Sequence, residues 1–177
     1  MHDGAPARLL LVGMMGAGKT TVGRCLAGRL GWELADSDAM VEASTGRTVA
    51  QIWEAAGVAA FRTEEKRALA EALTGDRPVV VSVAGGAVLD ASNRALMRRS
   101  GVVVWLRAAV ETLAERVGDG GSHRPLLDGD PLGVLHELDA VRRPLYAAVA
   151  DIVVDVDQLD APAVADRVLA TMPALPR

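Results

Sequence analysis

A glycine-rich octapeptide near the start of the sequence carries the clearest chemistry. Gly13-Met14-Met15-Gly16-Ala17-Gly18-Lys19-Thr20 matches the pattern G-x-x-x-x-G-K-[ST] in full. Glycines permit a loop whose backbone N–H groups face inward onto phosphate oxygens, and a helix that follows adds the positive end of its dipole. We expect Lys19 to reach the β- and γ-phosphates and the Thr20 hydroxyl to bind Mg²⁺. The octapeptide therefore predicts a nucleoside triphosphate site.

Two aspartates form the next group with chemical potential, in Asp36-Ser37-Asp38. Two carboxylates that are two residues apart in an extended segment point to the same side. One would then hold the water shell of a metal ion while the other meets a substrate hydroxyl. The alternative is that Asp38 only caps the helix that follows, as aspartate commonly does. The residues alone leave both interpretations open.

Arginines at two places have the geometry for binding a carboxylate. Arg62 precedes Glu65 by three residues, and Arg142-Arg143-Pro144 comes late in a segment with helical character. The planar fork of arginine meets a carboxylate through two hydrogen bonds. Each group also has an ordinary alternative: an exposed i,i+3 ion pair for Arg62, and solvated cations for the second group.

Two glycine-rich stretches complete the set of candidate site segments. Ala84-Gly85-Gly86 follows a run of valines, where glycines let backbone N–H groups approach a ligand closely, unless the stretch is only a tight turn. Segment 118–122 is the most flexible by composition and leads to Arg124. A mobile loop that ends in arginine resembles a lid that brings a cation onto phosphates, although an isolated loop of this kind is more often only a surface loop.

The segments that must position these residues alternate between strand and helix character. Short apolar runs predict strands at 9–12, 32–35, 79–83, 102–106 and 152–156. Between and after them we expect helices at 19–30, 38–44, 48–56, 58–73, 92–99, a segment ending at 117, 132–148 with an interruption near Pro144, and 162–171. This alternation predicts an α/β fold, with a parallel sheet covered by helices on both faces and ligands at the carboxyl ends of the strands.

Composition and charge narrow the function classes. The 177 residues suit one domain, and the net charge of −4 gives no global field that would recruit nucleic acid or an anionic membrane. Aromatic residues make up 3%, too few for a single-strand stacking platform. One cysteine, strand-sized apolar runs and no visible signal peptide lead us to expect a cytoplasmic protein, and the lack of an interface signal a monomer. Because no N-K-x-D motif reads guanine and no second motor domain fits, a small-molecule kinase is favoured.

Together and in this order, the segments resemble shikimate kinase. The resemblance spans about residues 9–156 and adds to the phosphate loop the elements Asp36-Ser37-Asp38, Phe61-Arg62, Ala84-Gly85-Gly86, Arg124-Pro125-Leu126-Leu127 and Arg142-Arg143-Pro144-Leu145-Tyr146. It implies a P-loop kinase fold: a five-stranded parallel sheet sandwiched by helices in one domain (1–177), with a lid at about 116–127 and a substrate-binding region at about 36–65. The implied reaction transfers the γ-phosphoryl group of ATP to the 3-hydroxyl of shikimate, with Mg²⁺, in chorismate and aromatic amino-acid biosynthesis.

The resemblance also implies roles for individual residues. The nucleotide would contact Met14, Gly16, Ala17, Gly18, Lys19, Thr20, Thr21, Arg116 beside the adenine, and Arg124 on the lid. Shikimate would contact Asp38, Arg62, Gly85, Gly86 and Arg142, while Mg²⁺ would be bound by Thr20 with help from Asp36 through water. Lys19, Asp38 and Arg124 would be catalytic, with Asp38 orienting the attacking hydroxyl or accepting its proton.

Three features depart from the family pattern. Ala84 stands where the family usually has a first glycine, the lid between Arg116 and Arg124 is one residue longer, and segment 157–162 lacks an arginine that many members carry beside the adenine. Because an alanine at positive φ is strained, we predict that Ala84 has negative φ as the last residue of the strand at 79–83, with its Cβ directed away from the substrate.

Two other functions compete with shikimate phosphorylation. A related kinase such as a gluconate kinase also takes a polyhydroxylated carboxylate, so a carboxylate clamp alone does not separate the two. A catalytically silent nucleotide-binding regulator is the alternative from another class, and it predicts loss of Lys19, Asp38 or the clamp arginines, all of which are present.

Overall fold

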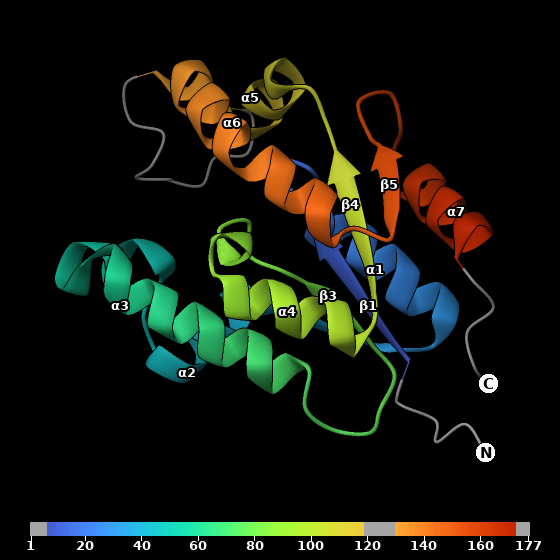
Figure 1. Ribbon diagram of the computed structural model, residues 1–177, viewed down its shortest axis with the longest axis horizontal. Coiled ribbons are helices and arrows are strands. Elements are labelled where there is room, and N and C mark those ends of the chain that lie inside the picture. Colours follow the sequence, from blue (N-terminus) through green and yellow to red (C-terminus); the bar gives the residue numbers. More distant parts are fainter. Residues whose placement is uncertain (1–6, 119–129, 173–177) are drawn as a thin grey trace.

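Five parallel strands form the centre of the protein, as the sequence predicts. The structure is a computed structural model that describes residues 7–118 and 130–172. The strand order is β2-β3-β1-β4-β5 (Figure 1), with bounds β1 Arg8–Val12, β2 Glu33–Asp36, β3 Val79–Ser82, β4 Val102–Arg107 and β5 Ile152–Asp155. Each pair of neighbouring strands is parallel, so all carboxyl ends meet at one edge of the sheet.

Helices cover both faces of this sheet. Their bounds are α1 Lys19–Leu30, α2 Ser37–Thr45, α3 Val49–Ala72, η1 Ala87–Leu89, α4 Ala91–Ser100, α5 Val110–Gly118, α6 Pro131–Val149 and α7 Ala161–Thr171. Helices α1 and α7 pack together on one face, while α4 and α6 pack against β4 on the other. Helices α2 and α3 pack mainly against each other and lie on the opposite side of the strands from α7 in Figure 1.

The central strands carry unbroken apolar runs because both of their faces are covered. Leu9, Leu10 and Leu11 of β1 are fully buried, as are Val80 and Val81 of β3. Strands of this kind need no alternation of polar and apolar residues, which is typical of parallel sheets between helix layers. The main core therefore lies on both faces of the sheet around β1.

A second, smaller core joins α2 to α3. It consists of Val41, Ile52, Phe61 and Ala68. Helix α3 begins with the expected Thr48 cap and bends at Gly57, whose φ of 76° and ψ of 174° are not helical. The two helices predicted at 48–56 and 58–73 are thus two arms of one bent element, and the bend directs the side chains of both arms inward.

One helix differs from its prediction. Helix α6 runs without interruption through Pro144, where the sequence predicts a break. Proline removes one backbone hydrogen bond and costs about 3 kcal/mol in a helix interior. Buried residues lie on both sides of it, Leu135 and Arg142 before and Tyr146 and Val149 after, and their packing keeps the helix continuous. Tertiary packing outweighs the local preference.

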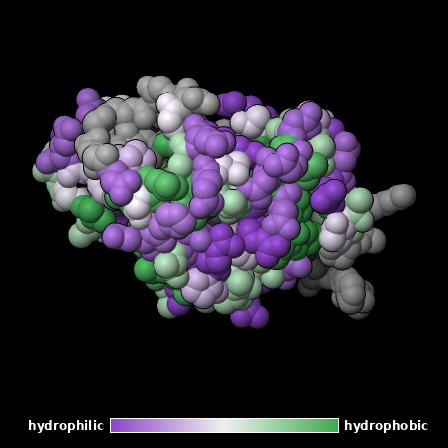
Figure 2. All heavy atoms as spheres, turned by 90° about the horizontal axis from the view of Figure 1, so that it is seen from above, coloured by the Kyte–Doolittle hydropathy of each residue, from purple (hydrophilic) through white to green (hydrophobic). Residues whose placement is uncertain are grey.

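The surface of the protein is mainly hydrophilic on the face that Figure 2 shows. On the face shown in Figure 2, hydrophilic side chains cover most of the area and hydrophobic ones form small separate patches. Within residues 7–118 and 130–172, no helix has both the length and the apolar character to cross a membrane.

Candidate active site

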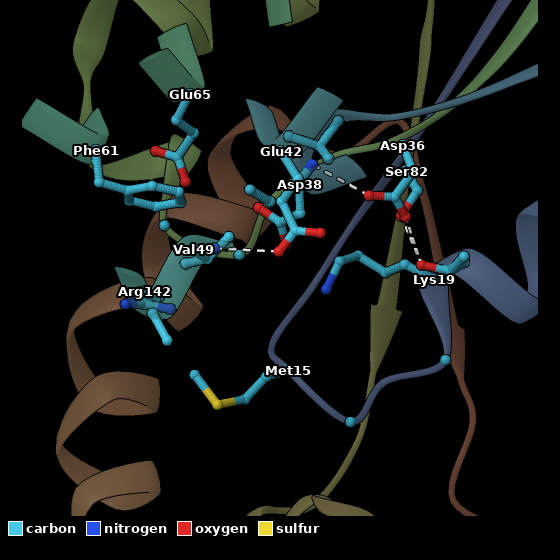
Figure 3. Close-up of a pocket in the computed structure, with 18 of the residues that line it drawn as sticks. Met15, Lys19, Asp36, Asp38, Glu42, Val49, Phe61, Glu65, Ser82 and Arg142 are labelled. Atoms are coloured by element: carbon cyan, nitrogen blue, oxygen red, sulfur yellow. Dashed lines mark hydrogen bonds between the residues drawn. The ribbon is translucent and has the colours of Figure 1, made fainter. Parts of the chain in front are cut away.

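A cavity of about 570 Å³ opens at the carboxyl ends of β1, β2 and β3. Three segments line it: the phosphate loop after β1, the aspartate corner (Asp36 to Asp38) at the end of β2, and the Ala84-Gly85-Gly86 turn after β3. Figure 3 shows Asp38 between the Lys19 side of the cavity and the Arg142 and Glu65 side. The fold thus brings the predicted phosphate and acceptor residues to one cavity.

The phosphate loop has the conformation that its glycines predict. Gly18 caps α1 without a side-chain hydrogen bond and has a φ of 86°, a left-handed conformation that favours glycine. The Lys19 ammonium donates to the carbonyl oxygens of Gly13 (2.8 Å) and Met14 (3.0 Å). Met14 and Ala17 are buried in the core, so their side chains do not face the cavity, whereas Thr21 lines it.

Three oxygen-bearing side chains gather beside the loop. The Thr20 hydroxyl donates to Asp36 Oδ2 at 2.6 Å and lies 3.3 Å from Ser82 Oγ. No cluster of three or more histidine, cysteine or acidic side chains that would hold a metal by itself occurs in the described parts of the chain. Mg²⁺ characteristically uses one or two protein oxygens together with waters and substrate phosphates, and this donor set fits that requirement.

The aspartate corner differs from its prediction in one respect. Asp36, not Asp38, is the N-cap of α2, and its carboxylate accepts from the backbone N–H groups of Asp38 (3.1 Å) and Ala39 (3.2 Å). Because the chain turns into the helix directly after Asp36, the two aspartates do not share one extended segment. Asp38 is therefore released from capping, and both carboxylates still line the cavity.

The Arg62–Glu65 pair is part of the cavity wall. Arg62 Nη1 donates to Glu65 Oε1 (2.7 Å) and Oε2 (2.8 Å). The Glu65 side chain is 2% exposed, and burial raises the pKa of its carboxyl, against the opposing charge of Arg62. The Arg62 guanidinium is therefore fixed by a buried carboxylate at the cavity wall and is not part of an exposed ion pair. The interpretation of Arg62 as an arginine oriented by Glu65 is the one that the geometry supports.

The Ala84-Gly85-Gly86 turn is fixed by contacts from distant segments. The Ala84 N–H donates to the buried Ser37 hydroxyl at 2.8 Å, and Ala84 does not have positive φ, as predicted. Strand β3 ends at Ser82, so Ala84 lies beyond the strand rather than at its last position. A Cβ built on Gly86 would overlap the Arg62 guanidinium, which lies directly against that backbone.

Arg142 approaches the same turn from α6. Its side chain is 3% exposed, and Nε is buried with no hydrogen-bond partner among the described residues. Arg142 Nη1 lies 3.5 Å from a Cβ built on Gly85. The two clamp arginines therefore contact neighbouring glycines of one turn, Arg62 at Gly86 and Arg142 at Gly85.

Arg116, which the resemblance puts beside the adenine, also lines the cavity. Its Nη2 donates to the carbonyl oxygen of Val156 at 2.8 Å and lies 3.3 Å from that of Asp157. These bonds hold the guanidinium of α5 against the loop after β5. Arg124 and the segment 119–129 lie outside the described residues, so the predicted lid cation has no structural description.

Several cavity residues were not identified from the sequence. They are Met15, Glu42, Val49, Ala50, Trp53, Ser82 and Val83. Ser82 had a usable signal, since it is the polar residue that ends a buried valine strand. Glu42 accepts from the Val49 N–H at 3.1 Å and so ties α2 to the start of α3. Trp53 and Val49 depend on how α3 bends over the cavity, for which the sequence carries no signal.

Comparisons with known proteins identify the family. A shikimate kinase family model matches residues 15–173. The chain belongs to the shikimate kinase family. A shikimate kinase of Symbiobacterium thermophilum is 50% identical over 152 residues, which is 85% of this chain and 87% of the relative. Another, from Halorhodospira halophila, is 44% identical over 99% of this chain and 98% of its own.

Solved structures agree with the family assignment. Shikimate kinase from Acinetobacter baumannii in complex with shikimate superimposes with a TM-score of 0.85 at 38% identity, covering 93% of this chain and 91% of that one. A gluconokinase from Sinorhizobium meliloti reaches a TM-score of 0.60 at 21% identity and shares the fold alone. The predicted family and P-loop kinase fold are confirmed, and the shikimate interpretation is favoured over the gluconate kinase and silent-regulator alternatives.

Proposed function

We propose that this shikimate kinase family member transfers the γ-phosphoryl group of ATP to the 3-hydroxyl of shikimate, in chorismate and aromatic amino-acid biosynthesis. One observation carries the proposal: a complete phosphate-binding loop and two buried or half-buried arginines line one cavity, and Asp38 lies between Lys19 and Arg142. That arrangement suits an acceptor with a carboxylate at one end and a hydroxyl near the phosphates at the other. Gluconate shares this chemistry and is the second candidate acceptor.

In this proposal Lys19 leaves its two loop carbonyls to contact the β- and γ-phosphates, and the loop amides bind the phosphate oxygens. Arg62 and Arg142 bind the shikimate carboxylate, each through its planar fork. Asp38 accepts a hydrogen bond from the attacking hydroxyl and orients it toward the phosphorus. Arg124 belongs to a lid at about 116–127, and the substrate-binding region covers about 36–65 of one domain that spans 1–177.

Thr20, assisted by Asp36 through water, would hold Mg²⁺ beside the phosphates. The ion would supply charge that offsets the phosphate oxygens. The closely spaced hydroxyl and carboxylate oxygens support this assignment. EDTA is expected to abolish turnover, and excess MgCl₂ to restore it. We further propose a cytoplasmic monomer that uses no nucleic acid or membrane partner.

A coupled assay of ADP release tests the reaction. It compares shikimate, gluconate and no acceptor, with Lys19→Ala as the inactive control. Turnover is expected only with shikimate, and phosphorus NMR of the product is expected to show the phosphate on the 3-hydroxyl. ADP release that does not depend on shikimate, or that is faster with gluconate, would refute the proposal.

A further inference from the structure

Tyr146 is buried beside the cavity and has no part in the mechanism above. It lies on α6 one turn after Arg142 and is 1% exposed. Its ring stacks on Trp105 of β4, with centroids 5.8 Å apart and an interplanar angle of 30°. Its hydroxyl donates to the Gly85 carbonyl oxygen at 2.6 Å. The Tyr146 hydroxyl, carried on a buried and stacked ring, thus reaches the turn that Arg62 and Arg142 also contact.

The hydrogen bond fixes the orientation of a peptide unit. In a trans peptide the carbonyl and the following N–H point in opposite directions. Because the Gly85 carbonyl points to Tyr146, the N–H of Gly86 points away from the phenol. The other end of the turn is fixed separately, since the Ala84 N–H is bonded to Ser37 of α2. The turn is therefore held from two elements on different sides of the cavity.

The Tyr146 hydroxyl also lies beside the Arg142 side chain. A Cβ built on Gly85 would lie 3.5 Å from both Tyr146 Oη and Arg142 Nη1, so the two side chains pack over one Cα. Arg142 Nε has no partner among the described residues, whereas the guanidinium interacts with the Tyr146 hydroxyl. Burial raises the pKa of the Tyr146 phenol, with Arg142 opposing, so the hydroxyl stays a donor at neutral pH.

We propose that Tyr146 is a positioning residue of the acceptor site: its hydroxyl holds the Gly85–Gly86 peptide and the neighbouring Arg142 in the arrangement that binds the acceptor carboxylate. The inference rests on the proposed function and adds a residue to it. It separates two roles of α6, with Arg142 contacting the acceptor and Tyr146 acting through the turn and through Arg142.

Tyr146→Phe tests this role because it removes one oxygen and keeps the ring on Trp105. Loss of a single buried hydrogen bond corresponds to a rise of about three- to tenfold in the KM for shikimate. The kcat and the KM for ATP are expected to stay within about twofold, since the phenol hydroxyl is bonded to the turn on the acceptor side of the cavity. Melting temperatures are measured alongside the kinetics.

Thr171→Val is the matched control. Thr171 donates its hydroxyl to the carbonyl oxygen of Arg167 in α7, remote from the cavity, and its loss is expected to leave both KM values unchanged. If Tyr146→Phe lowers the melting temperature but leaves the KM for shikimate unchanged, Tyr146 is only structural and the inference is overturned. Equal changes in both KM values would overturn it too. Wild-type protein that does not phosphorylate shikimate would instead refute the proposed function.

Discussion

Gly86→Ala is a small change that we expect to disable one arm of the acceptor clamp. Gly86 has φ −88° and ψ −9°, a conformation open to any residue, so alanine meets no backbone strain there. The obstacle is spatial, because the new methyl group would occupy the place of the Arg62 guanidinium. Since a guanidinium is the free end of a long side chain, the fold can tolerate the substitution while Arg62 moves away.

The expected rise in the KM for shikimate follows from the interactions that a displaced Arg62 loses. Its Nη1 bonds both oxygens of Glu65, at 2.7 and 2.8 Å, and that pair fixes the direction of the guanidinium. A displaced Arg62 loses the charge-assisted contact with the acceptor carboxylate, worth about 2–3 kcal/mol. At 1.36 kcal/mol per factor of ten, the KM for shikimate is expected to rise about 30- to 150-fold. The KM for ATP is expected to change little.

Steady-state kinetics with each substrate varied in turn measure this effect. Gly28→Ala is the control, because Gly28 lies inside α1 with nothing within 4 Å of a built Cβ. There the same substitution is expected to add about 0.5–1 kcal/mol to the free energy of unfolding and to leave both KM values alone. A Gly86→Ala enzyme with normal KM for shikimate would show that Arg62 does not bind the acceptor from this position.

Three further predictions concern other parts of the site and fold. Lys19→Ala and Asp38→Asn are each expected to lower kcat by at least about a hundredfold without unfolding the protein, and near-normal kcat in Asp38→Asn would refute its role at the hydroxyl. Arg142→Ala is expected to raise the KM for shikimate by about a hundredfold, whereas an equal rise for ATP would indicate a structural role. Asp90 is the N-cap of α4, where its carboxylate accepts from the backbone N–H groups of Ser92 and Asn93. Asp90→Ala is therefore expected to lower the free energy of unfolding by about 1 kcal/mol at pH 7, in chemical denaturation. Hydrogen bonds from Ser92 hold the Asp90 pKa well below 3.8, so this difference should shrink as pH falls below that value, and a pH-independent difference would refute the assignment.

The sequence predicted the order of the elements because each boundary had a local cause. Helix α1 is ended by its C-cap Gly31, whose φ of 68° suits glycine, and α3 is started by its N-cap Thr48, which forms a capping box with Gln51. The interruption at Pro144 was predicted wrongly, since proline's local cost was known but the burial that offsets it was not. Local signals set where elements begin, and packing decides whether a costly residue ends one.

The candidate site was predicted to the same depth. The resemblance to shikimate kinase implied a shared site for Lys19, Asp38, Arg62 and Arg142, and all four line one cavity, whereas the residues alone left the last three open. The sequence did not reveal that Asp36 would take the capping role, because either aspartate could cap the first turn of a helix that begins after it. Nor did it reveal the contact of Tyr146 with Gly85, which joins residues 61 positions apart. Contacts of that range depend on how the helices pack over the sheet.

In the turn at Ala84-Gly85-Gly86 only the first residue carries a side chain, and the surroundings of the three residues differ accordingly. Ala84 has both backbone groups satisfied within the protein: its N–H donates to Ser37, and its carbonyl accepts from the Ala87 N–H at 3.0 Å. A Cβ at Gly85 would lie 3.2 Å from the Gly13 carbonyl oxygen and 3.5 Å from both Arg142 Nη1 and Tyr146 Oη, whereas a Cβ at Gly86 would overlap the Arg62 guanidinium. Because neither glycine has positive φ, the neighbouring groups and not the backbone conformation restrict these two positions.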